Sequence, residues 1–252
     1  MGAAKKLLEE VVIASRLLDG AEWLNWTAGL CTGLPTVVRH RTLDPLDQRV
    51  GSEFSFRSAR RQIQLSGASF GVVREIFGRH AYISADELSE CRTVVDLGAN
   101  CGIFSLFALL NAPAAHVHAI DMQPAMVAAL NANVSVNGFA SRITAATGMI
   151  GPPYDEWSRQ FSRDHPEVLP VNLEELMERV GPCDFLKCDI EGAEYHIVNQ
   201  QMRWLDAVRR FSMEYHGTPA DGERLASVLR LRGFQVKRRD HGKLGYLDGI
   251  RM

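Results

Sequence analysis

The chain has 252 residues, a length that allows one large or two small domains and a substantial buried core. Hydrophobic residues make up 46% of the sequence and charged residues 23%, as in an ordinary globular enzyme. The net charge of −2 gives no general attraction to nucleic acid or to membrane surfaces, so we expect neither as a partner.

The amino-terminal stretch shows no pattern of a leader peptide or of a membrane span. Its apolar run is interrupted by charged residues at positions 5, 6, 9, 10 and 16. The five cysteines, at positions 31, 91, 101, 183 and 188, form no Cys-x-x-Cys pair and no zinc-ligand spacing with histidine. We therefore expect a cytoplasmic protein with reduced thiols.

Residues 1–90 are expected to form an extension in front of the main domain. Apolar residues recur at helical spacing over residues 4–18, and a second helix is expected to carry Trp23 and Trp26. Residues 36–65 are predicted to form short strands joined by turns. We expect this extension to help shape a substrate pocket or to mediate oligomerisation, and a homodimer is compatible with the sequence.

The 36–65 window is mildly basic. A solvated surface explains this excess of positive charge, and the alternative is that the substrate is anionic. The arginines of the window are Arg39, Arg41, Arg49, Arg57, Arg60 and Arg61, and its carboxylates are Asp44, Asp47 and Glu53.

From residue 93 onward, strand patterns alternate with helix patterns. Such alternation predicts an α/β fold, a mainly parallel sheet with helices on both faces, over residues 91–252. Residues 149–170 are predicted to be a long polar loop. Strands are expected at 93–97, 116–120, 142–146, 183–188 and 211–215, helices at 102–111, 124–136, 173–177, 192–202 and 219–232, and a closing antiparallel pair at 235–237 and 245–247.

The strand that ends at Leu97 runs into a glycine turn and then a buried helix. A strand, a turn and a helix N-terminus form a nucleotide cradle, here with Gly98 and Gly102 in the turn. Asn100 stands where a dinucleotide fingerprint requires the glycine that lets the backbone approach pyrophosphate. Asp96, near the strand end, would repel phosphates and attract a sulfonium or an ammonium. The cradle therefore favours S-adenosylmethionine, a nucleoside that carries cationic groups and no phosphate.

A second strand ends at Asp121, 18 residues after Ile103. At this spacing an acidic side chain accepts hydrogen bonds from the ribose hydroxyls, so we assign that role to Asp121. A surface aspartate in a loop is the alternative interpretation. The remaining candidate cofactor contacts are Ala99, Cys101, Met122, Thr147, Gly148 and Asp189.

Three polar side chains follow the last two parallel strands, where ligands bind in open α/β sheets. Asp189 is expected beside the methyl donor, and Glu214 and His216 are two residues apart on one strand, so they face the same side. His216 is our first choice as general base for an alcohol nucleophile and Asp189 is the second. A structural pair is one alternative for Glu214 and His216. Another is a divalent metal bound by all three, which nothing in the spacing demands.

Three segments resemble the FkbM family of S-adenosylmethionine-dependent methyltransferases: Val95–Gly102, Leu173–Leu176 and Asp184–Glu194. The resemblance covers about residues 93–216. It implies a class I methyltransferase with a Rossmann-like, seven-stranded sheet that yields S-adenosylhomocysteine as a product. It also implies O-methylation of a small molecule, such as a polyketide, a sugar or another secondary metabolite. One departure is Asp121, where the family more often has glutamate.

Other functions remain open at this point. The acceptor atom could be nitrogen or a carboxylate oxygen instead of a hydroxyl. A nucleotide-dependent oxidoreductase would need phosphate-cradling glycines, against which Asn100 argues. A non-catalytic nucleoside-binding or regulatory module would have no reason to carry Asp189, Glu214 and His216 at strand ends.

Overall fold

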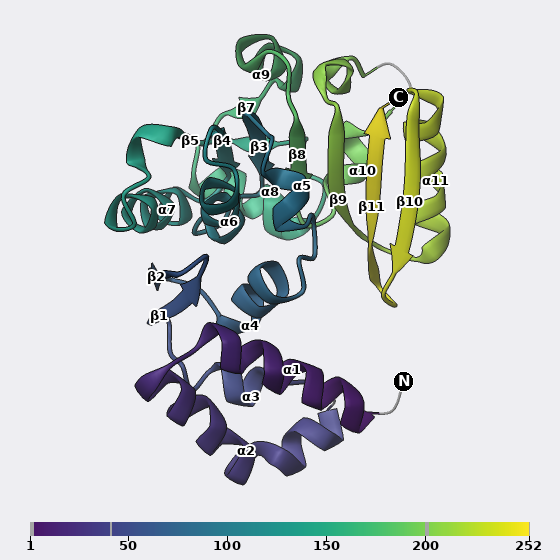
Figure 1. The fold of residues 1–252 in the computed structure, drawn as a ribbon. Coiled ribbons are helices and arrows are strands. Elements are labelled where there is room, and N and C mark those ends of the chain that lie inside the picture. The colour runs from purple at the N-terminus through teal and green to yellow at the C-terminus, as the bar shows by residue number, and fades with distance from the viewer. Residues whose placement is uncertain (1–2, 41, 200–201, 252) are drawn as a thin grey trace.

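The fold is described by a computed structural model that covers residues 3–40, 42–199 and 202–251 (Figure 1). Its centre is a seven-stranded sheet of order β10-β11-β9-β8-β3-β4-β5. The pairs from β9 to β5 are parallel, and β11 is antiparallel to both of its neighbours. These pairings confirm the predicted fold class. The strands are β3 (Thr93–Leu97), β4 (His116–Asp121), β5 (Ile143–Thr147), β8 (Phe185–Cys188), β9 (Arg210–His216), β10 (Phe234–Asp240) and β11 (Leu244–Arg251).

Helices cover both faces of this sheet, as predicted. Neighbouring residues of a strand point to opposite faces, and on β3 Val94 joins the apolar cluster of α6 and α7 while Val95 joins that of α9, α10 and α11. The strands are therefore buried on both sides, which is why they appear in the sequence as continuous apolar runs. The helices are α6 (Ile103–Asn111), α7 (Pro124–Val136), α9 (Leu173–Val180), α10 (Glu194–Ile197) and α11 (Pro219–Leu231).

The predicted loop at 149–170 is wrong, because the segment holds regular structure. It forms β6 (Met149–Ile150), α8 (Glu156–Asp164) and β7 (Pro170–Val171). Asp155 begins α8 with a capping box, in which its side chain accepts from the Ser158 backbone N–H. The helix is amphipathic, with Trp157 and Phe161 four residues apart and their rings stacked, a helical spacing that the prolines on both sides of the segment obscured.

The predicted helix at 192–202 is also wrong in its extent. Within the described residues α10 covers only Glu194–Ile197, and positions 200–201 lie outside them. Glu191 and Gly192 both have positive φ, which keeps the turn after β8 from continuing directly into a helix. This irregular turn carries the side chains of Glu191 and Glu194 toward His216 at the end of β9.

The first 90 residues contain more helix than predicted. The second helix, α2, continues to His40 and α3 begins at Asp44, so the predicted strands of the 36–65 window are confined to one hairpin. Pro45 lies in the first turn of α3, where its missing N–H costs no hydrogen bond. The elements are α1 (Ala3–Leu17), α2 (Gly20–His40), α3 (Asp44–Asp47), β1 (Glu53–Ser58), β2 (Arg61–Ser66), α4 (Phe70–Val73), the π-helical turn η1 (Arg74–Gly78) and α5 (Ala85–Leu88).

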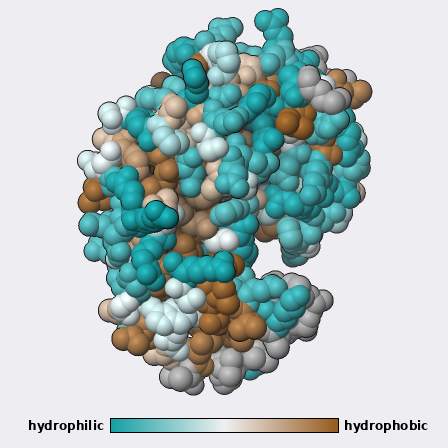
Figure 2. Space-filling model, in the orientation of Figure 1, coloured by the Kyte–Doolittle hydropathy of each residue, from teal (hydrophilic) through white to brown (hydrophobic). Residues whose placement is uncertain are grey.

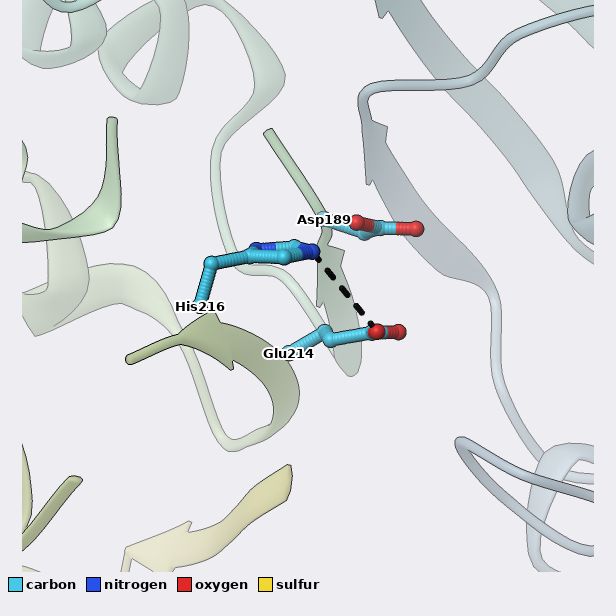
Figure 3. Close-up of side chains that lie close together, drawn as sticks. All are labelled: Asp189, Glu214 and His216. Carbon is cyan, nitrogen blue, oxygen red and sulfur yellow. Dashed lines mark ion pairs between the residues drawn. The ribbon is translucent and has the colours of Figure 1, made fainter. Parts of the chain in front are cut away.

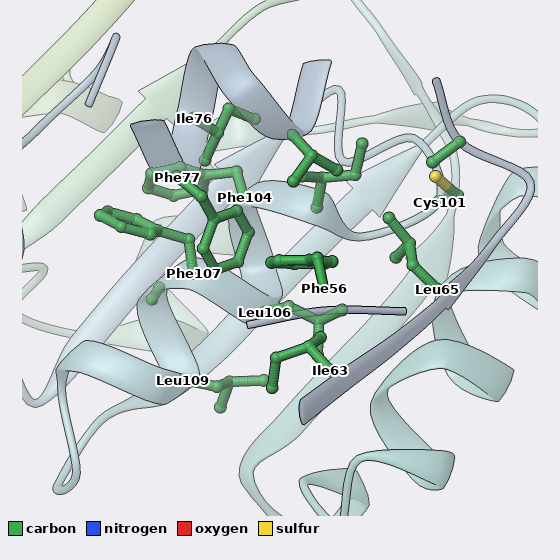
Figure 4. Packing of buried hydrophobic residues seen from close by; sticks show 14 of the residues in the cluster. Phe56, Ile63, Leu65, Ile76, Phe77, Cys101, Phe104, Leu106, Phe107 and Leu109 are labelled. Carbon is green, nitrogen blue, oxygen red and sulfur yellow. The ribbon is translucent and has the colours of Figure 1, made fainter. Parts of the chain in front are cut away.

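This extension shares its apolar core with the sheet. Phe77 makes edge-to-face ring contacts with Phe56 of β1 at 4.8 Å and with Phe107 of α6 at 5.2 Å (Figure 4). Beyond η1, the chain carries Tyr82 against Phe104, with ring centroids 5.6 Å apart. The extension thereby places one tyrosine at the carboxyl ends of β8 and β9, where the candidate site lies.

Apolar residues gather on the surface of the amino-terminal helices, at the bottom of the space-filling view, while the surface above is largely hydrophilic (Figure 2). Leu8 and Leu24 are among the exposed apolar side chains of α1 and α2. Among the described residues, no helix combines the length and the apolar character that crossing a membrane requires.

Candidate active site

The turn between β3 and α6 is built by three residues with positive φ: Gly98 at 75°, Asn100 at 50° and Gly102 at 88°. A Cβ on Gly98 would lie 1.7 Å from the carbonyl oxygen of Asp189, so the turn packs directly against the backbone that follows β8. A Cβ on Gly102 would lie 2.8 Å from the Leu130 side chain of α7. Both glycines are therefore required for close packing as well as for their backbone conformation.

A cavity of about 370 Å³ opens beside this turn, at the carboxyl ends of the parallel strands. Six of the predicted cofactor contacts line it: Gly98, Asn100, Asp121, Met122, Gly148 and Asp189. The other five, Asp96, Ala99, Cys101, Gly102 and Thr147, are not among its lining residues.

The 149–170 segment forms one wall of this cavity, which the sequence did not predict. Tyr154, Trp157 and Ser158 line the cavity, and the Tyr154 hydroxyl donates to the carbonyl oxygen of Glu191. The aromatic residues of that segment were a signal for this role. Their placement depends on α8, which the sequence did not reveal.

Asp121 faces the cavity and organises both loops beside it. Its Oδ2 accepts from the backbone N–H of Asn100 and its Oδ1 from that of Gln123, each at 2.8 Å. Burial raises the pKa of the Asp121 carboxyl, and these two hydrogen bonds oppose the rise. Each oxygen keeps a second lone pair, so the carboxylate can still accept from ribose hydroxyls.

Asp121→Ala is expected to weaken S-adenosylhomocysteine binding by about 1.5–3 kcal/mol, measured by calorimetry. The melting temperature of the ligand-free protein should fall as well, because two backbone donors lose their acceptor. Asp184→Ala is a matched control, since Asp184 accepts from the backbone N–H groups of Arg92 and Thr93 at the opposite end of the sheet. The control should lower the melting temperature and leave the affinity unchanged. An equal loss of affinity in both variants would contradict a ribose contact.

Asp96 lies beneath the cavity and not in its wall. Its side chain is fully buried, accepts from the Ser105 hydroxyl at 2.7 Å, and has Oδ1 3.3 Å from Lys187 Nζ. Burial disfavours the charged form of Lys187, but Asp96 and Asp189 outweigh it and raise the pKa of the ammonium. Lys187 Nζ also donates to the carbonyl oxygen of Gly98 at 2.6 Å. This pair, which the sequence analysis did not identify, fixes the glycine turn from below.

Asp189, Glu214 and His216 come together as the sequence predicts (Figure 3). One ligand atom from each lies within 4.8 Å of the others. Tyr82, a residue that the sequence analysis missed, bridges the two carboxylates, with its hydroxyl 2.9 Å from Asp189 Oδ2 and 3.1 Å from Glu214 Oε2. Asp189 Oδ1 is buried and has no hydrogen-bond partner. Because Asp189 also lines the cofactor cavity, this cluster and the cavity meet at one carboxylate.

Carboxylates surround His216 on several sides. Its Nε2 lies 3.2 Å from Glu191 Oε2 and 3.8 Å from Glu214 Oε1, and its Nδ1 lies 3.7 Å from Glu194 Oε1. Interaction with the buried Glu194 raises the pKa of His216 to about 9. Burial and the nearby Asp189 raise the pKa of Glu214 to about 7. His216 therefore carries a proton at neutral pH in the protein alone, which does not favour it as the general base.

Known proteins are similar in sequence to parts of this chain. Residues 96–236 match the family described as the methyltransferase FkbM domain. Over 79 residues, 31% of the chain, the sequence is 39% identical to the 31-O-demethyl-FK506 methyltransferase FkbM of Streptomyces tacrolimicus. Over 56 residues, 22% of the chain, it is 50% identical to the tRNA wybutosine-synthesizing protein 2 homolog of Danio rerio. The chain spans 30% of the first relative and 14% of the second.

Solved structures align with part of this chain at low sequence identity. An O-methyltransferase family protein from Burkholderia thailandensis is 17% identical, with a TM-score of 0.44 over 72% of this chain and 57% of that chain. The METTL16 MTase domain is 14% identical, with a TM-score of 0.47 over 72% of this chain and 66% of that chain.

Proposed function

The chain belongs to the FkbM family of methyltransferases, with S-adenosylmethionine as the cofactor, and from this premise we propose that it methylates a hydroxyl oxygen of a small molecule. The observation that supports this most is the position of Asp189. It lies both in the wall of the cofactor cavity and in the cluster with Glu214 and His216. A methyl donor in the cavity and an acceptor at the cluster would then both lie beside the Asp189 carboxylate.

The proposed reaction is an in-line displacement. The acceptor oxygen forms a bond to the methyl carbon, the bond between that carbon and sulfur breaks, and its electron pair stays on sulfur as a neutral thioether. Alignment of these three atoms supplies much of the rate. The hydroxyl proton passes to a carboxylate of the cluster, and the unpartnered Asp189 Oδ1 is the acceptor atom that the geometry favours.

The Gly98–Gly102 turn and Asp121 support a nucleoside cofactor without phosphates. Asp121 would accept from the ribose hydroxyls, and the aromatic residues Tyr154 and Trp157 would lie against the base or the sugar. The Lys187 ammonium holds the turn from below, so it stabilises the shape of the pocket.

The arginines at 36–65 give little support to an anionic acceptor. Arg57 pairs with Asp19 at 3.3 Å, and Arg61 lies over the Phe139 ring, 5.0 Å from its centroid. None of the arginines that the structure describes in this window lines the cofactor cavity, and Arg41 lies outside the described residues. A solvated surface is therefore the interpretation that we prefer for this window.

The proposed function is tested first by measuring cofactor binding and then by measuring methyl transfer. Calorimetry should show that S-adenosylhomocysteine binds far more tightly than NAD. Methyl transfer from labelled S-adenosylmethionine should then be measured with matched alcohols, amines and carboxylic acids, and with transfer RNA, because one relative is named for tRNA modification. We expect label on the alcohols. Label on amines, acids or RNA alone would overturn the hydroxyl acceptor, and cofactor binding without transfer to any class would indicate a non-catalytic module.

A further inference from the structure

We propose that Asp189, Glu214 and His216 form a binding site for a divalent cation, with Asp189 Oδ1, Glu214 Oε1 and His216 Nε2 as its ligand atoms. Among the residues that the structure describes, these three make the one group of His, Cys, Asp or Glu with metal-binding spacing. One ligand atom from each residue lies within 4.8 Å of the others, whereas neighbouring ligands of one ion with bonds of about 2.1 Å are about 3–3.4 Å apart. Small side-chain rotations close that difference.

Each ligand group already has a neighbour on its other side. Of the proposed atoms, Asp189 Oδ1 has no hydrogen-bond partner, and His216 Nε2 has the exposed Glu191 carboxylate at 3.2 Å. Tyr82 takes Asp189 Oδ2 and Glu214 Oε2, so Oδ1 and Oε1 remain. Glu194 faces His216 Nδ1, and Nε2 lies 3.8 Å from Glu214 Oε1. A carboxylate behind a histidine and a hydrogen bond to a ligating carboxylate are partners that orient metal ligands in proteins, although the single Tyr82 proton serves one carboxylate at a time.

Buried groups without partners give independent support. The Glu194 side chain has no exposed surface, and its Oε2 lacks a hydrogen-bond partner, as do Asp189 Oδ1 and His216 Nδ1. Such groups are costly to bury unless a charge compensates them. With His216 neutral and bound to a cation, its Nδ1 carries the proton and can donate to Glu194 Oε1, 3.7 Å away, which satisfies the histidine.

The charge around the cluster also favours a bound cation. Four carboxylates surround His216: Asp189, Glu191, Glu194 and Glu214. Lys187 is the nearest ammonium, 3.8 Å from Asp189 Oδ2, but it lies closer to Asp96, at 3.3 Å. One protonated histidine, and one lysine that is shared with a buried aspartate, leave these four carboxylates with excess negative charge.

The sulfonium of S-adenosylmethionine is a competing source of positive charge, because Asp189 and Glu191 line the cofactor cavity. A sulfonium, however, does not bind the lone pair of an imidazole nitrogen, whereas a metal ion does. Two carboxylate oxygens and one imidazole nitrogen suit Mn²⁺, Mg²⁺ or Zn²⁺, each with positions left open for another ligand. Glu191 is 81% exposed on its side chain and is free to turn toward the ion or away from it.

The role of this cation rests on the proposed function, whereas its binding does not. An ion at the cluster would bind the acceptor hydroxyl in an open position and lower its pKa, as metal ions do for water. The hydroxyl proton would then leave to solvent or to a carboxylate oxygen that does not contact the ion. The ion would take over the activating role that Asp189 Oδ1 has in the protein alone.

Mn²⁺ is the probe, because its bound state can be followed by electron paramagnetic resonance. Titration of EDTA-treated protein should show one Mn²⁺ per chain, both alone and with S-adenosylhomocysteine, which has a neutral sulfur. Electron spin-echo modulation should show coupling to an imidazole nitrogen in the wild-type protein, a result that depends on no variant. No stoichiometric Mn²⁺ at millimolar concentration, or bound Mn²⁺ without nitrogen coupling, would overturn the site.

Substitutions in the cluster identify which side chains bind the ion. Asp189→Asn, Glu214→Gln and His216→Gln should each weaken Mn²⁺ binding by about 100-fold, and only His216→Gln should remove nitrogen coupling in the ion that remains bound. Glu194→Gln should weaken binding by about 10-fold and keep the coupling, as expected for a positioning residue. Glu167→Gln alters an exposed histidine–carboxylate pair elsewhere, with His165, and should change nothing.

Activity separates the two proposals. Full methyl transfer in the presence of EDTA would contradict the catalytic role of the ion and leave the methyltransferase proposal intact. Binding of Mn²⁺ with nitrogen coupling, together with no transfer to any hydroxyl, would support the site and contradict the proposed function.

Discussion

Gly98→Ala is expected to lower the free energy of unfolding of the cofactor-free protein by about 2–5 kcal/mol and to abolish S-adenosylhomocysteine binding. The new methyl group would lie 1.7 Å from the carbonyl oxygen of Asp189, and no side-chain rotation relieves a contact with backbone. Overpacking contributes about 1–3 kcal/mol of this loss, and the positive φ contributes about 1–2 kcal/mol. Urea denaturation and calorimetry measure the two effects.

Gly138→Ala is the matched control. Gly138 has nearly the same φ, 79° against 75°, but nothing lies within 4 Å of its added Cβ. This variant should lose only the conformational part, about 1–2 kcal/mol, and should keep full cofactor affinity. If both variants lose the same stability, the approach of Asp189 to the turn is not what requires glycine at position 98.

The sequence predicts the sheet and the cofactor turn well because their signals are local. Buried parallel strands are continuous apolar runs, and helix-spaced apolar residues lie between them. The turn is specified by Gly98, Asn100 and Gly102 within five positions, and each has the positive φ that its residue type tolerates. The pairing of β10 with β11 follows from the same kind of local pattern.

The rest of the site depends on contacts between residues far apart in the chain. Tyr82 reaches Asp189 from 107 positions earlier, and nothing near it in the sequence marks it as a site residue. Glu194 appears in the sequence as a helix-start carboxylate, and only the irregular turn after β8 brings it to His216. Asp96 was expected to attract the cationic cofactor from a strand end, but it is buried below the cavity, where Lys187 from the neighbouring strand neutralises it.

Asp189→Asn is expected to lower kcat for methyl transfer by about 10²–10⁴-fold, because an alcohol is a weak nucleophile that must be activated. The amide keeps the shape of the side chain but loses the negative charge at Oδ1, whether that atom accepts the proton or binds a cation. S-adenosylhomocysteine affinity should change less than kcat does, as measured by single-turnover kinetics and calorimetry. Asp184→Asn, at the amino end of the same sheet region, should leave kcat unchanged although it removes a structural carboxylate.

The Asp189→Asn/Glu214→Gln double variant tests whether the cluster acts as one unit. Glu214→Gln alone should also lower kcat by about 10²-fold or more, since Tyr82 ties its carboxyl to that of Asp189. Groups that serve one step are strongly non-additive, so the double variant should be no slower than the slower single variant by more than about threefold. Multiplication of the two single losses would show that Asp189 and Glu214 act in separate steps. Full kcat in Asp189→Asn would show that alignment in the cavity alone drives the transfer.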